Sequence, residues 1–310
     1  MRLTLLLGLL LYSSLTFAQK NKDASVLRTD FDASLYEEQL RLTELMYWSQ
    51  HGDSTFDRND ANYLFIRGLV RALRTEGAFE FPFDSLRYIS KLYTPDRKYR
   101  IFTWQVKQQF GTYRHFGCIL PSDPKAAILP LIDQSDVYIG RDDTILTNKA
   151  WYGAAYFQIV PEIIKIKGIS YYTLIGYDPH EPFSQRKMID FLWFDKTGTP
   201  HFGAPLLETP KGIKHRFYIE YASDVMVQLR YDLNAQKIVY DHLIPRNSEN
   251  AGLGFDDVPD GSFNAFVLKK KMWRFEDNTD IRLQFGSPEP EKKPGSAPKK
   301  PQSGLLPPEN

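Results

Sequence analysis

The chain has 310 residues, 42% of them hydrophobic, and its 39 basic residues nearly balance 38 acidic ones. This hydrophobic content excludes a wholly disordered chain, and the near-zero charge gives no electrostatic reason to expect nucleic acid or an anionic membrane as a partner. The single cysteine excludes an internal disulfide and a multi-thiolate metal site.

Residues 1–18 are typical of a secretory signal peptide. A basic residue follows the first Met, residues 3–15 form a largely apolar run, and Thr16 and Ala18 place small residues at the −3 and −1 positions of a cut before Gln19. The run is too short for an ordinary spanning helix, and no later stretch reaches roughly 18 consecutive apolar residues. The sequence therefore predicts an exported protein, periplasmic or extracellular, whose mature chain is soluble and has no transmembrane helix.

Residues 19–95 are expected to form a helical N-terminal portion. Apolar residues recur at helical spacing in 32–48 and, more regularly, in 58–75. Gly77 is placed to end the second helix, and three residues near its start are candidate caps: Asp57, Asn59 and Asp60. A shorter helix is expected at 85–92. Because such amphipathic helices need a partner surface, we expect them to pack on the rest of the chain.

Residues 96–285 are expected to form an antiparallel β-rich domain. Segments 99–106 and 112–120 are predicted to form a hairpin around Gly111. Further strands are predicted at 153–165, 170–177, 187–195, 214–222, 225–232, 237–244, 263–268 and 271–285. No stretch of helical period interrupts the second half of this region, so parallel crossovers are not expected there.

The sequence also predicts the surroundings of two residues inside these strands, Asp190 and Cys118. Segment 188–194 is apolar on both faces except at Asp190, which suits a central strand that is covered on both sides. Cys118 has apolar neighbours and is expected to be buried and inert. The fold predicted from all these patterns is α+β, with N-terminal helices packed on a mainly antiparallel β-sheet unit, either a sandwich or an open barrel.

Residues 286–310 are expected to be a disordered tail. They hold seven of the 20 prolines, several lysines and no aromatic residue. Such a segment cannot bury enough apolar surface to offset the entropy lost on ordering. A proline-rich ligand for a groove is the alternative interpretation.

The chemistry of the chain must be sought outside the standard motifs. The sequence contains no G-x-S-x-G, H-E-x-x-H, Walker or G-x-G-x-x-G motif and no cofactor signature. One polar cluster follows the predicted strand 170–177 and contains Asp178, His180 and Glu181. These residue types could supply an acid/base pair or metal ligands, whereas the two prolines beside them favour ordinary turn chemistry.

Two further polar clusters follow later strands. In the first, Asp241 and His242 point to opposite faces of a strand, so His242 is expected to be buried and hydrogen-bonded while Asp241 bonds backbone donors at the strand end. In the second, the carboxylates of Asp256, Asp257 and Asp260 could share a calcium ion. Asp260 also precedes a glycine, which favours a turn.

The order of the strands decides whether these clusters meet. In a simple up-and-down meander, strand ends alternate between the two edges of a sheet. Counting from segment 170–177 to 237–244 places the first cluster at one end and the other two together at the opposite end, so that Asp178, His180 and Glu181 do not meet His242 or Asp257. A Greek-key crossover would change this arrangement.

The aromatic residues of the β-rich region have two interpretations. Exposed rings on strands can stack on sugars, and five residues are candidates: Trp104, Trp151, Tyr152, Trp193 and Trp273. Aromatic residues that alternate along strands more often pack in the core or across strands.

Five segments of the β-rich region occur in an order that resembles a known group of proteins. They are 171-YYTLIGYD-178, 191-FLWFDKTGTPHFG-203, 216-RFYIEYASDVMVQLRYD-232, 240-YDHLIP-245 and 258-VPDGSFNAF-266. Together they resemble exported β-rich proteins of Gram-negative bacteria for which no activity is established. The resemblance covers roughly residues 150–275. It implies export and a β-rich unit that the group shares, including the two Asp/Gly-containing loops. It implies no catalytic residue.

The sequence leaves three functional hypotheses. Missing catalytic motifs and abundant aromatic strand surface favour a non-catalytic binding or structural module of the periplasm or cell envelope, whose partner is an envelope glycan or another envelope protein. The alternatives are a hydrolase-like enzyme that uses loop carboxylates and a histidine, His180 or His242, and a calcium-stabilised module.

Overall fold

The computed structural model describes residues 34–137, 143–277 and 279, all of which belong to one structural unit. The predicted signal peptide and the predicted C-terminal tail lie outside the described residues. Among the described residues, none of the helices is both long and apolar enough to cross a membrane.

Two helices precede the sheets. Residues 34–51 are helical, and α2 spans Thr55–Leu73. Ser54 caps α2 in a capping box with Asp57, so the cap lies before the predicted candidates. Gly68 lets the helices approach closely, because a Cβ there would lie 2.8 Å from Leu42. Both predicted helices are confirmed.

The predicted third helix at 85–92 is wrong. Residues 84–89 form turns, and β1, Ser90–Tyr93, follows them. Lys91 donates to the carbonyls of Phe83 and Leu86, and Phe83 has a positive φ of 54°. The apolar spacing that suggested a helix arises because Leu86 and Ile89 pack into the core from an irregular segment.

The first sheet has the order β1-β2-β3-β4 and is antiparallel throughout. It consists of β1, β2 (Tyr99–Lys107), β3 (Tyr113–Pro121) and β4 (Leu129–Ile132). The predicted hairpin around Gly111 is confirmed as β2 and β3. Strand β2 is buried on both faces, with Ile101 on one side and Phe102 and Trp104 on the other.

The second sheet has the order β5-β9-β8-β7-β6, and β12 also pairs with β8. Its strands are β5 (Leu146–Thr147), β6 (Ala155–Ile166), β7 (Ile169–Asp178), β8 (Ser184–Phe194), β9 (Pro200–Phe202) and β12 (Phe217–Ala222). Strand β8 is the predicted central strand: Met188 and Leu192 face the first sheet, whereas Ile189 and Phe191 face the third.

The third sheet has the order β11-β10-β16-β15-β14-β13. Its strands are β10 (Leu207–Thr209), β11 (Gly212–Lys214), β13 (Leu229–Asp232), β14 (Lys237–Pro245), β15 (Asp257–Lys269) and β16 (Met272–Glu276). Its neighbouring strands are antiparallel except for β10 and β16, which pair in parallel.

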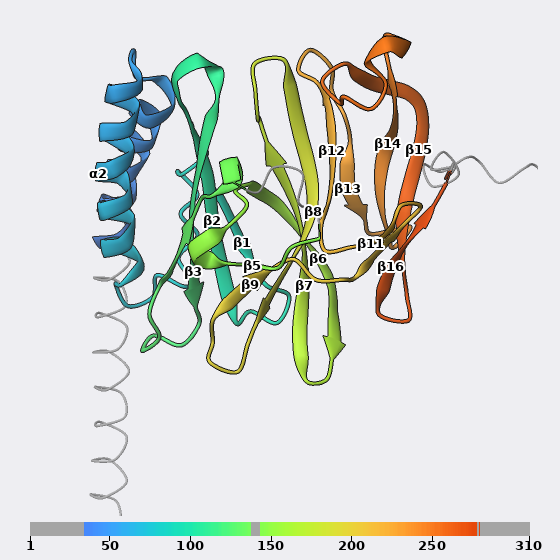
Figure 1. Ribbon diagram of the computed structural model, residues 1–310. Helices are drawn as coiled ribbons and strands as arrows, with labels where there is room; N and C mark the ends of the chain where they lie inside the picture. Colours follow the sequence, from blue (N-terminus) through green and yellow to red (C-terminus); the bar gives the residue numbers. More distant parts are fainter. Residues whose placement is uncertain (1–33, 138–142, 278, 280–310) are drawn as a thin grey trace, which may run out of the picture. The chain divides into compact units, whose positions relative to one another are not determined.

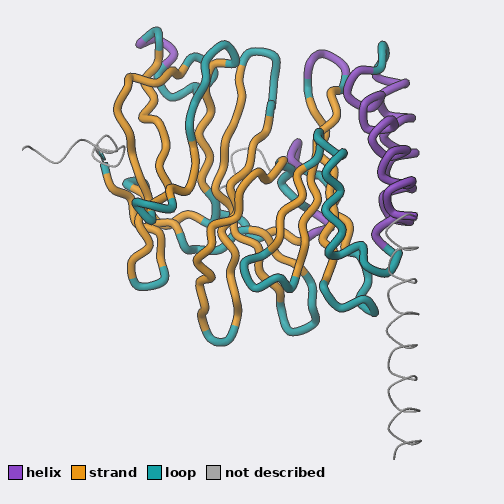
Figure 2. The backbone as a smooth tube through the Cα atoms, turned by 180° about the vertical axis from the view of Figure 1, so that it is seen from behind, coloured by secondary structure: helices purple, strands orange, loops and turns teal. Residues whose placement is uncertain are grey.

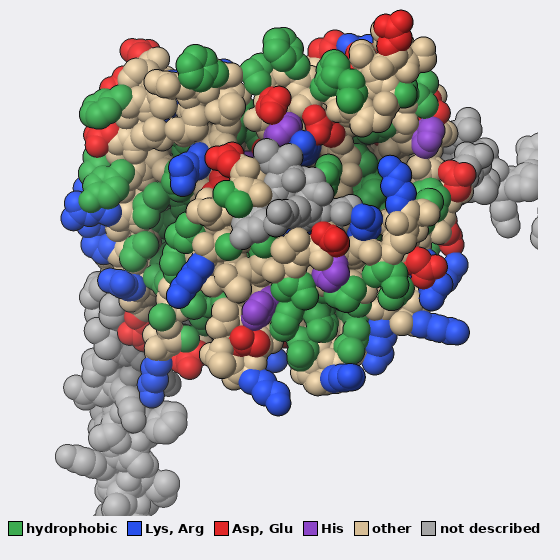
Figure 3. All heavy atoms as spheres, in the orientation of Figure 1, with side chains coloured by type: hydrophobic (Ala, Val, Ile, Leu, Met, Phe, Trp, Pro, Cys, Tyr) green, Lys and Arg blue, Asp and Glu red, His purple; other side chains and the backbone are tan. Residues whose placement is uncertain are grey.

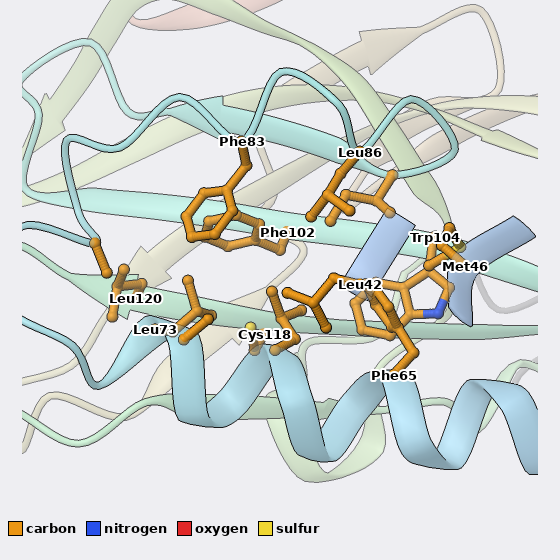
Figure 4. Close-up of a cluster of buried hydrophobic side chains, with 14 of the residues drawn as sticks. Leu42, Met46, Phe65, Leu73, Phe83, Leu86, Phe102, Trp104, Cys118 and Leu120 are labelled. Carbon is orange, nitrogen blue, oxygen red and sulfur yellow. The ribbon is translucent and has the colours of Figure 1, made fainter. Parts of the chain in front are cut away.

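The helices and the three sheets form four stacked layers (Figures 1 and 2). The helices cover one face of the first sheet, and Figure 4 shows the buried side chains between them. Two more apolar clusters fill the spaces between the first and second sheets and between the second and third. The α+β fold with mainly antiparallel sheets is confirmed, and the sheets are stacked as in a sandwich.

Candidate functional site

An apolar cleft of about 1,030 Å³ lies between α2 and the chain around β4. One wall is the side of α2 that carries Ile66, Leu69 and Val70, and the opposite wall includes Ile128 and Ile132. The volume lies at the upper end of the range for small-molecule sites, roughly 300–1,000 Å³. Because its walls are largely apolar, the cleft can hold an apolar molecule.

The floor of this cleft is formed by the first sheet. Trp104, Phe116 and Cys118 contribute to it, and Figure 4 places Cys118 between the sheet and α2. Burial raises the pKa of the Cys118 thiol to about 12, so the thiol stays protonated at neutral pH. The prediction that Cys118 is buried is confirmed. Sequence spacing alone could not show the cleft, because its walls come from segments far apart in the chain.

A smaller hollow of about 520 Å³, lined by charged and apolar side chains, lies at the loop after β7. The predicted cluster lies here: His180 and Glu181 line the hollow, and Asp178 anchors the loop by accepting a 2.8 Å hydrogen bond from the backbone N of His180. His180 has a positive φ of 49°, a conformation that costs energy in a residue with a side chain. The Asp178 contact helps to hold that conformation.

The His180 ring sits between two carboxylates. Its Nδ1 lies 3.8 Å from Asp178 Oδ2, and its Nε2 lies 3.6 Å from Glu181 Oε1. Burial and the nearby Arg186 lower the pKa of His180 more than the carboxylates raise it, so the imidazole is neutral at pH 7. Both distances from the ring to the carboxylates are longer than a hydrogen bond.

The floor of the hollow carries an ion pair. Arg186 on β8 donates from Nε and Nη2 to Oε2 of Glu220 on β12, at 2.9 and 2.7 Å. Both side chains are largely buried, and the guanidinium also lies over the ring of Tyr218. Direct pairing of β8 with β12 sets the two residues opposite each other.

A buried histidine lies behind the loop. His115 on β3 is 1% exposed, and its two ring nitrogens each lie 3.4 Å from a carboxylate oxygen, of Asp133 and of Asp178. Burial alone would lower the pKa of His115, but the two carboxylates outweigh it and the pKa is raised. Sequence reasoning missed His115 and Asp133, because both stand among apolar residues without a motif.

A second buried ionic group surrounds Asp190 on β8. Asp190 accepts from the Tyr156 hydroxyl at 3.2 Å, and Tyr156 accepts from the Trp151 ring nitrogen. Arg216 lies 3.6 Å from Asp190, with both side chains fully buried. Burial raises the pKa of Asp190 despite the arginine. This group lies inside the core, so its role is structural.

The second predicted cluster lies on β14. Asp241 accepts from the backbone N of Gln228 at 2.7 Å, so its predicted role is confirmed. His242 was expected to be buried, but its side chain is 40% exposed, and its Nδ1 lies 2.9 Å from Asp260 Oδ2. His242 lies where the register of β14 with β15 shifts, between Asp241 and Leu243, and there it contacts Asp260 instead of the core.

The carboxylates of the third cluster serve separate contacts. Asp256 accepts from the backbone N of Asn247 and from the Asn250 side chain. Asp260 accepts from Ser262 and pairs with His242, and these hydrogen bonds lower its pKa to about 2. Within the described ranges, no three His, Cys, Asp or Glu side chains are grouped so that they could hold a metal ion.

The predicted separation of the clusters is only partly correct. His242 and Asp260 do meet, as expected for the second and third clusters. However, Phe255, which immediately precedes Asp256 of the third cluster, lines the same hollow as His180 and Glu181. The meander count fails because β12 pairs with β8 in the second sheet, and the chain then crosses to β13 in the third.

The candidate sugar-stacking residues are mostly inaccessible. Four of the five are at most 3% exposed, Trp104, Trp151, Tyr152 and Trp273. Trp193 is partly exposed, but its ring stacks on His201. Several exposed aromatic residues lie on the helices, where hydrophobic side chains appear at the left edge in Figure 3: Tyr36, Tyr47, Trp48, Phe56 and Tyr63.

Comparison with known proteins does not indicate a function for this chain. No protein-family model matches the chain, and neither a curated protein nor a solved structure is significantly similar to it.

Proposed function

We propose that this protein is an exported, non-catalytic binding module of the periplasm or cell envelope that holds an apolar ligand in the cleft between α2 and β4. The observation that carries the proposal is the cleft of about 1,030 Å³ with its largely apolar walls. Export rests on the sequence of residues 1–18, which has the features of a cleavable signal peptide.

The chemistry of the cleft favours an amphiphile with one apolar chain. Leu69, Trp104 and Phe116 offer apolar surface in the interior, whereas Arg74 and Asp123 supply polar groups among the lining residues. A fatty acid matches this division, because its chain is removed from water while its head group can stay near polar side chains. Burial of each methylene contributes about 0.8 kcal/mol.

The proposal is tested by ligand binding to the mature chain, residues 19–310. We expect palmitate to raise the thermal midpoint and to displace the apolar dye N-phenyl-1-naphthylamine. Val70→Trp fills the cleft from α2 at a half-buried position and should weaken palmitate binding by about tenfold or more. N-terminal sequencing of the exported protein should give a chain that begins at Gln19.

Leu64→Trp is the matched control, because Leu64 is on the same helix, is 40% exposed and does not line the cleft. It should bind palmitate as the wild-type chain does. Wild-type protein that binds neither palmitate nor the dye would refute the proposal, and so would equal palmitate affinity in the two variants.

The hydrolase alternative has one observation in its favour, the presence of His180 and Glu181 in a common hollow. A general base is oriented by hydrogen bonds of about 2.6–3.2 Å. The His180 ring is 3.6 and 3.8 Å from its two carboxylates. The geometry therefore supports binding better than acid/base catalysis. Nor does it favour a calcium ion shared by Asp256, Asp257 and Asp260. Asp256 accepts hydrogen bonds from Asn247 and Asn250, and Asp260 pairs with His242.

A further inference from the structure

The hollow around His180 is separate from the apolar cleft, and no described residue lines both. It also differs in chemistry. Four of its eight lining residues have ionisable side chains, His180, Glu181, Arg186 and Glu220, and three are large apolar residues, Phe183, Leu253 and Phe255. A charged floor beside an apolar rim is an arrangement for a ligand that has both characters.

Among the described residues that line the hollow, the charged groups sum to one excess negative charge. The Arg186 guanidinium is matched by Glu220, and His180 is neutral at pH 7 because burial and Arg186 lower its pKa. Glu181 supplies the excess carboxylate, and its side chain is 58% exposed. The hollow therefore attracts a cation and repels an anion, since its single guanidinium is already paired.

A carboxylate oxygen of Glu220 remains available. Both Arg186 donors go to Oε2, and none of the described residues donates a hydrogen bond to Oε1. The pKa of the nearby Asp257 is raised, mainly by burial and further by the negative charges of Asp256 and Glu220. A cationic group beside Glu220 would relieve this repulsion.

The rim of the hollow exposes apolar surface. Phe183 is 77% exposed, Leu253 is 58% exposed and Phe255 is 42% exposed. Large apolar side chains that gather beside a charged hollow can take the apolar stem of a ligand, and a phenylalanine face also attracts a cation. The rim is drawn from two segments, the loop after β7 and the chain before β15.

The loop that carries His180 is held in place before any ligand arrives. Ser223 donates from its backbone N to the carbonyl of Phe183 and from its hydroxyl to that of Pro182, both at 2.9 Å. Asp178 holds the backbone of His180, and Gly111 at the tip of the β2–β3 hairpin packs against Pro182. A site that is already ordered loses less entropy on binding.

We propose that this hollow is a binding site for a protonated amine carried on an apolar stem. The ammonium group lies between Glu181 and Oε1 of Glu220, and the stem lies against Phe183 and Phe255. His180, which lines the same hollow, contributes by staying neutral, so that it does not repel the amine. The shared chemistry is an alkylammonium group, and its source is either a free amine or a lysine side chain of a peptide.

The experiment is a calorimetric titration of the mature protein with 2-phenylethylamine at pH 7.5. Binding is expected for this amine and not for 3-phenylpropanoate or 2-phenylethanol, which keep the ring and change the charge. Glu181→Gln removes the excess charge at an exposed position and should weaken amine binding by about tenfold. The peptide acetyl-Phe-Lys-amide distinguishes the two sources: tighter binding than the free amine indicates a lysine side chain, and weaker binding indicates a free amine.

Two control variants make the test specific. Glu37→Gln makes the same change at an exposed position on the first helix and should leave amine binding unchanged. Val70→Trp should also leave it unchanged, so failure of the apolar cleft and failure of this site are distinguishable. The proposal is overturned if the wild-type protein fails to bind the amine, if the neutral or anionic analogue binds equally well, or if Glu181→Gln has no effect.

Discussion

Ionisable side chains that are buried in the core make the stability of the folded chain depend on pH. His115 is the clearest case, since it lies between Asp133 and Asp178 with almost no access to water. Its burial disfavours the charged form, whereas two carboxylates within 3.4 Å favour it. The carboxylates prevail and the pKa of His115 is raised, so the imidazolium contributes to the stability of the folded chain.

His115 therefore predicts a pH-dependent difference in stability. Because its folded pKa exceeds the unfolded value of about 6.5, the contribution is complete below that value and is lost as pH rises through the folded pKa. His115→Gln should lower the free energy of unfolding by about 3–5 kcal/mol at pH 6 and by less at pH 9. Urea unfolding at both pH values measures the difference.

The control is His51→Gln, at an exposed histidine on the first helix whose ring contacts Tyr47 and Tyr88. It should change stability little at either pH. A His115→Gln deficit that is the same at pH 6 and pH 9 would contradict the assignment of a charged imidazole.

At the scale of elements, the conformation of the short segment before β6 depends on the close packing of Gly153 against its neighbours. Gly153 has a φ of +83°, and a Cβ there would lie 2.5 Å from Asp133 Oδ1 and 2.9 Å from His115 Nδ1. A glycine is needed for both reasons, the backbone conformation and the space. The segment thus passes close to both Asp133 and His115.

Gly153→Ala and Gly168→Ala form a matched pair. Gly168, in the turn between β6 and β7, has nearly the same φ, +82°, but has open space where a Cβ would be. Gly168→Ala should cost about 1 kcal/mol for the backbone conformation alone. Gly153→Ala should cost roughly 3 kcal/mol, because overpacking adds to that strain. Thermal unfolding of both variants compares them, and equal costs would show that the close approach is unimportant.

At the scale of the whole molecule, polar contacts connect the layers. Thr103 on β2 accepts from the backbone N of Tyr156 on β6, which joins the first sheet to the second. The ring nitrogen of Trp273 on β16 donates to Thr173 on β7, which joins the third sheet to the second. Buried hydrogen bonds of this kind fix how the sheets stack, and the three apolar cores between the layers share strands.

We therefore expect the described layers to unfold together. Unfolding in urea should give the same midpoint by circular dichroism and by tryptophan fluorescence. Thr103→Val leaves the buried Tyr156 amide without its acceptor and should lower both midpoints by an equal amount, equivalent to about 1–3 kcal/mol. The exposed Thr112→Val is the control. Separate midpoints for the two signals would indicate that the layers unfold independently.

Local patterns were sufficient for much of this fold. The β2–β3 hairpin, the second helix and the central strand with Asp190 follow from spacing that is visible within a few residues. The pattern failed at Leu86 and Ile89, where packing from an irregular segment imitates helical spacing. It also failed at His242, where the register of β14 with β15 shifts and alternation along the strand no longer predicts burial.

The candidate site was harder to predict for a physical reason. Asp178, His180 and Glu181 are adjacent in the chain, so their cluster was visible. Their partners come from elsewhere: Arg186 and Glu220 through the pairing of β8 with β12, and His115 through packing of the first sheet on the second. The walls of the apolar cleft likewise depend on tertiary packing that no local spacing records.

The parallel pairing of β10 with β16 has a consequence for the order of events during synthesis. Residues 207–209 are made well before their partners at 272–276, the last strand among the described residues. Until that partner exists, β10 can pair only with β11, and its other edge is open to any passing strand. A chain that stopped before Met272 would keep that edge permanently exposed, so the end of the β-rich region protects a strand made more than sixty residues earlier.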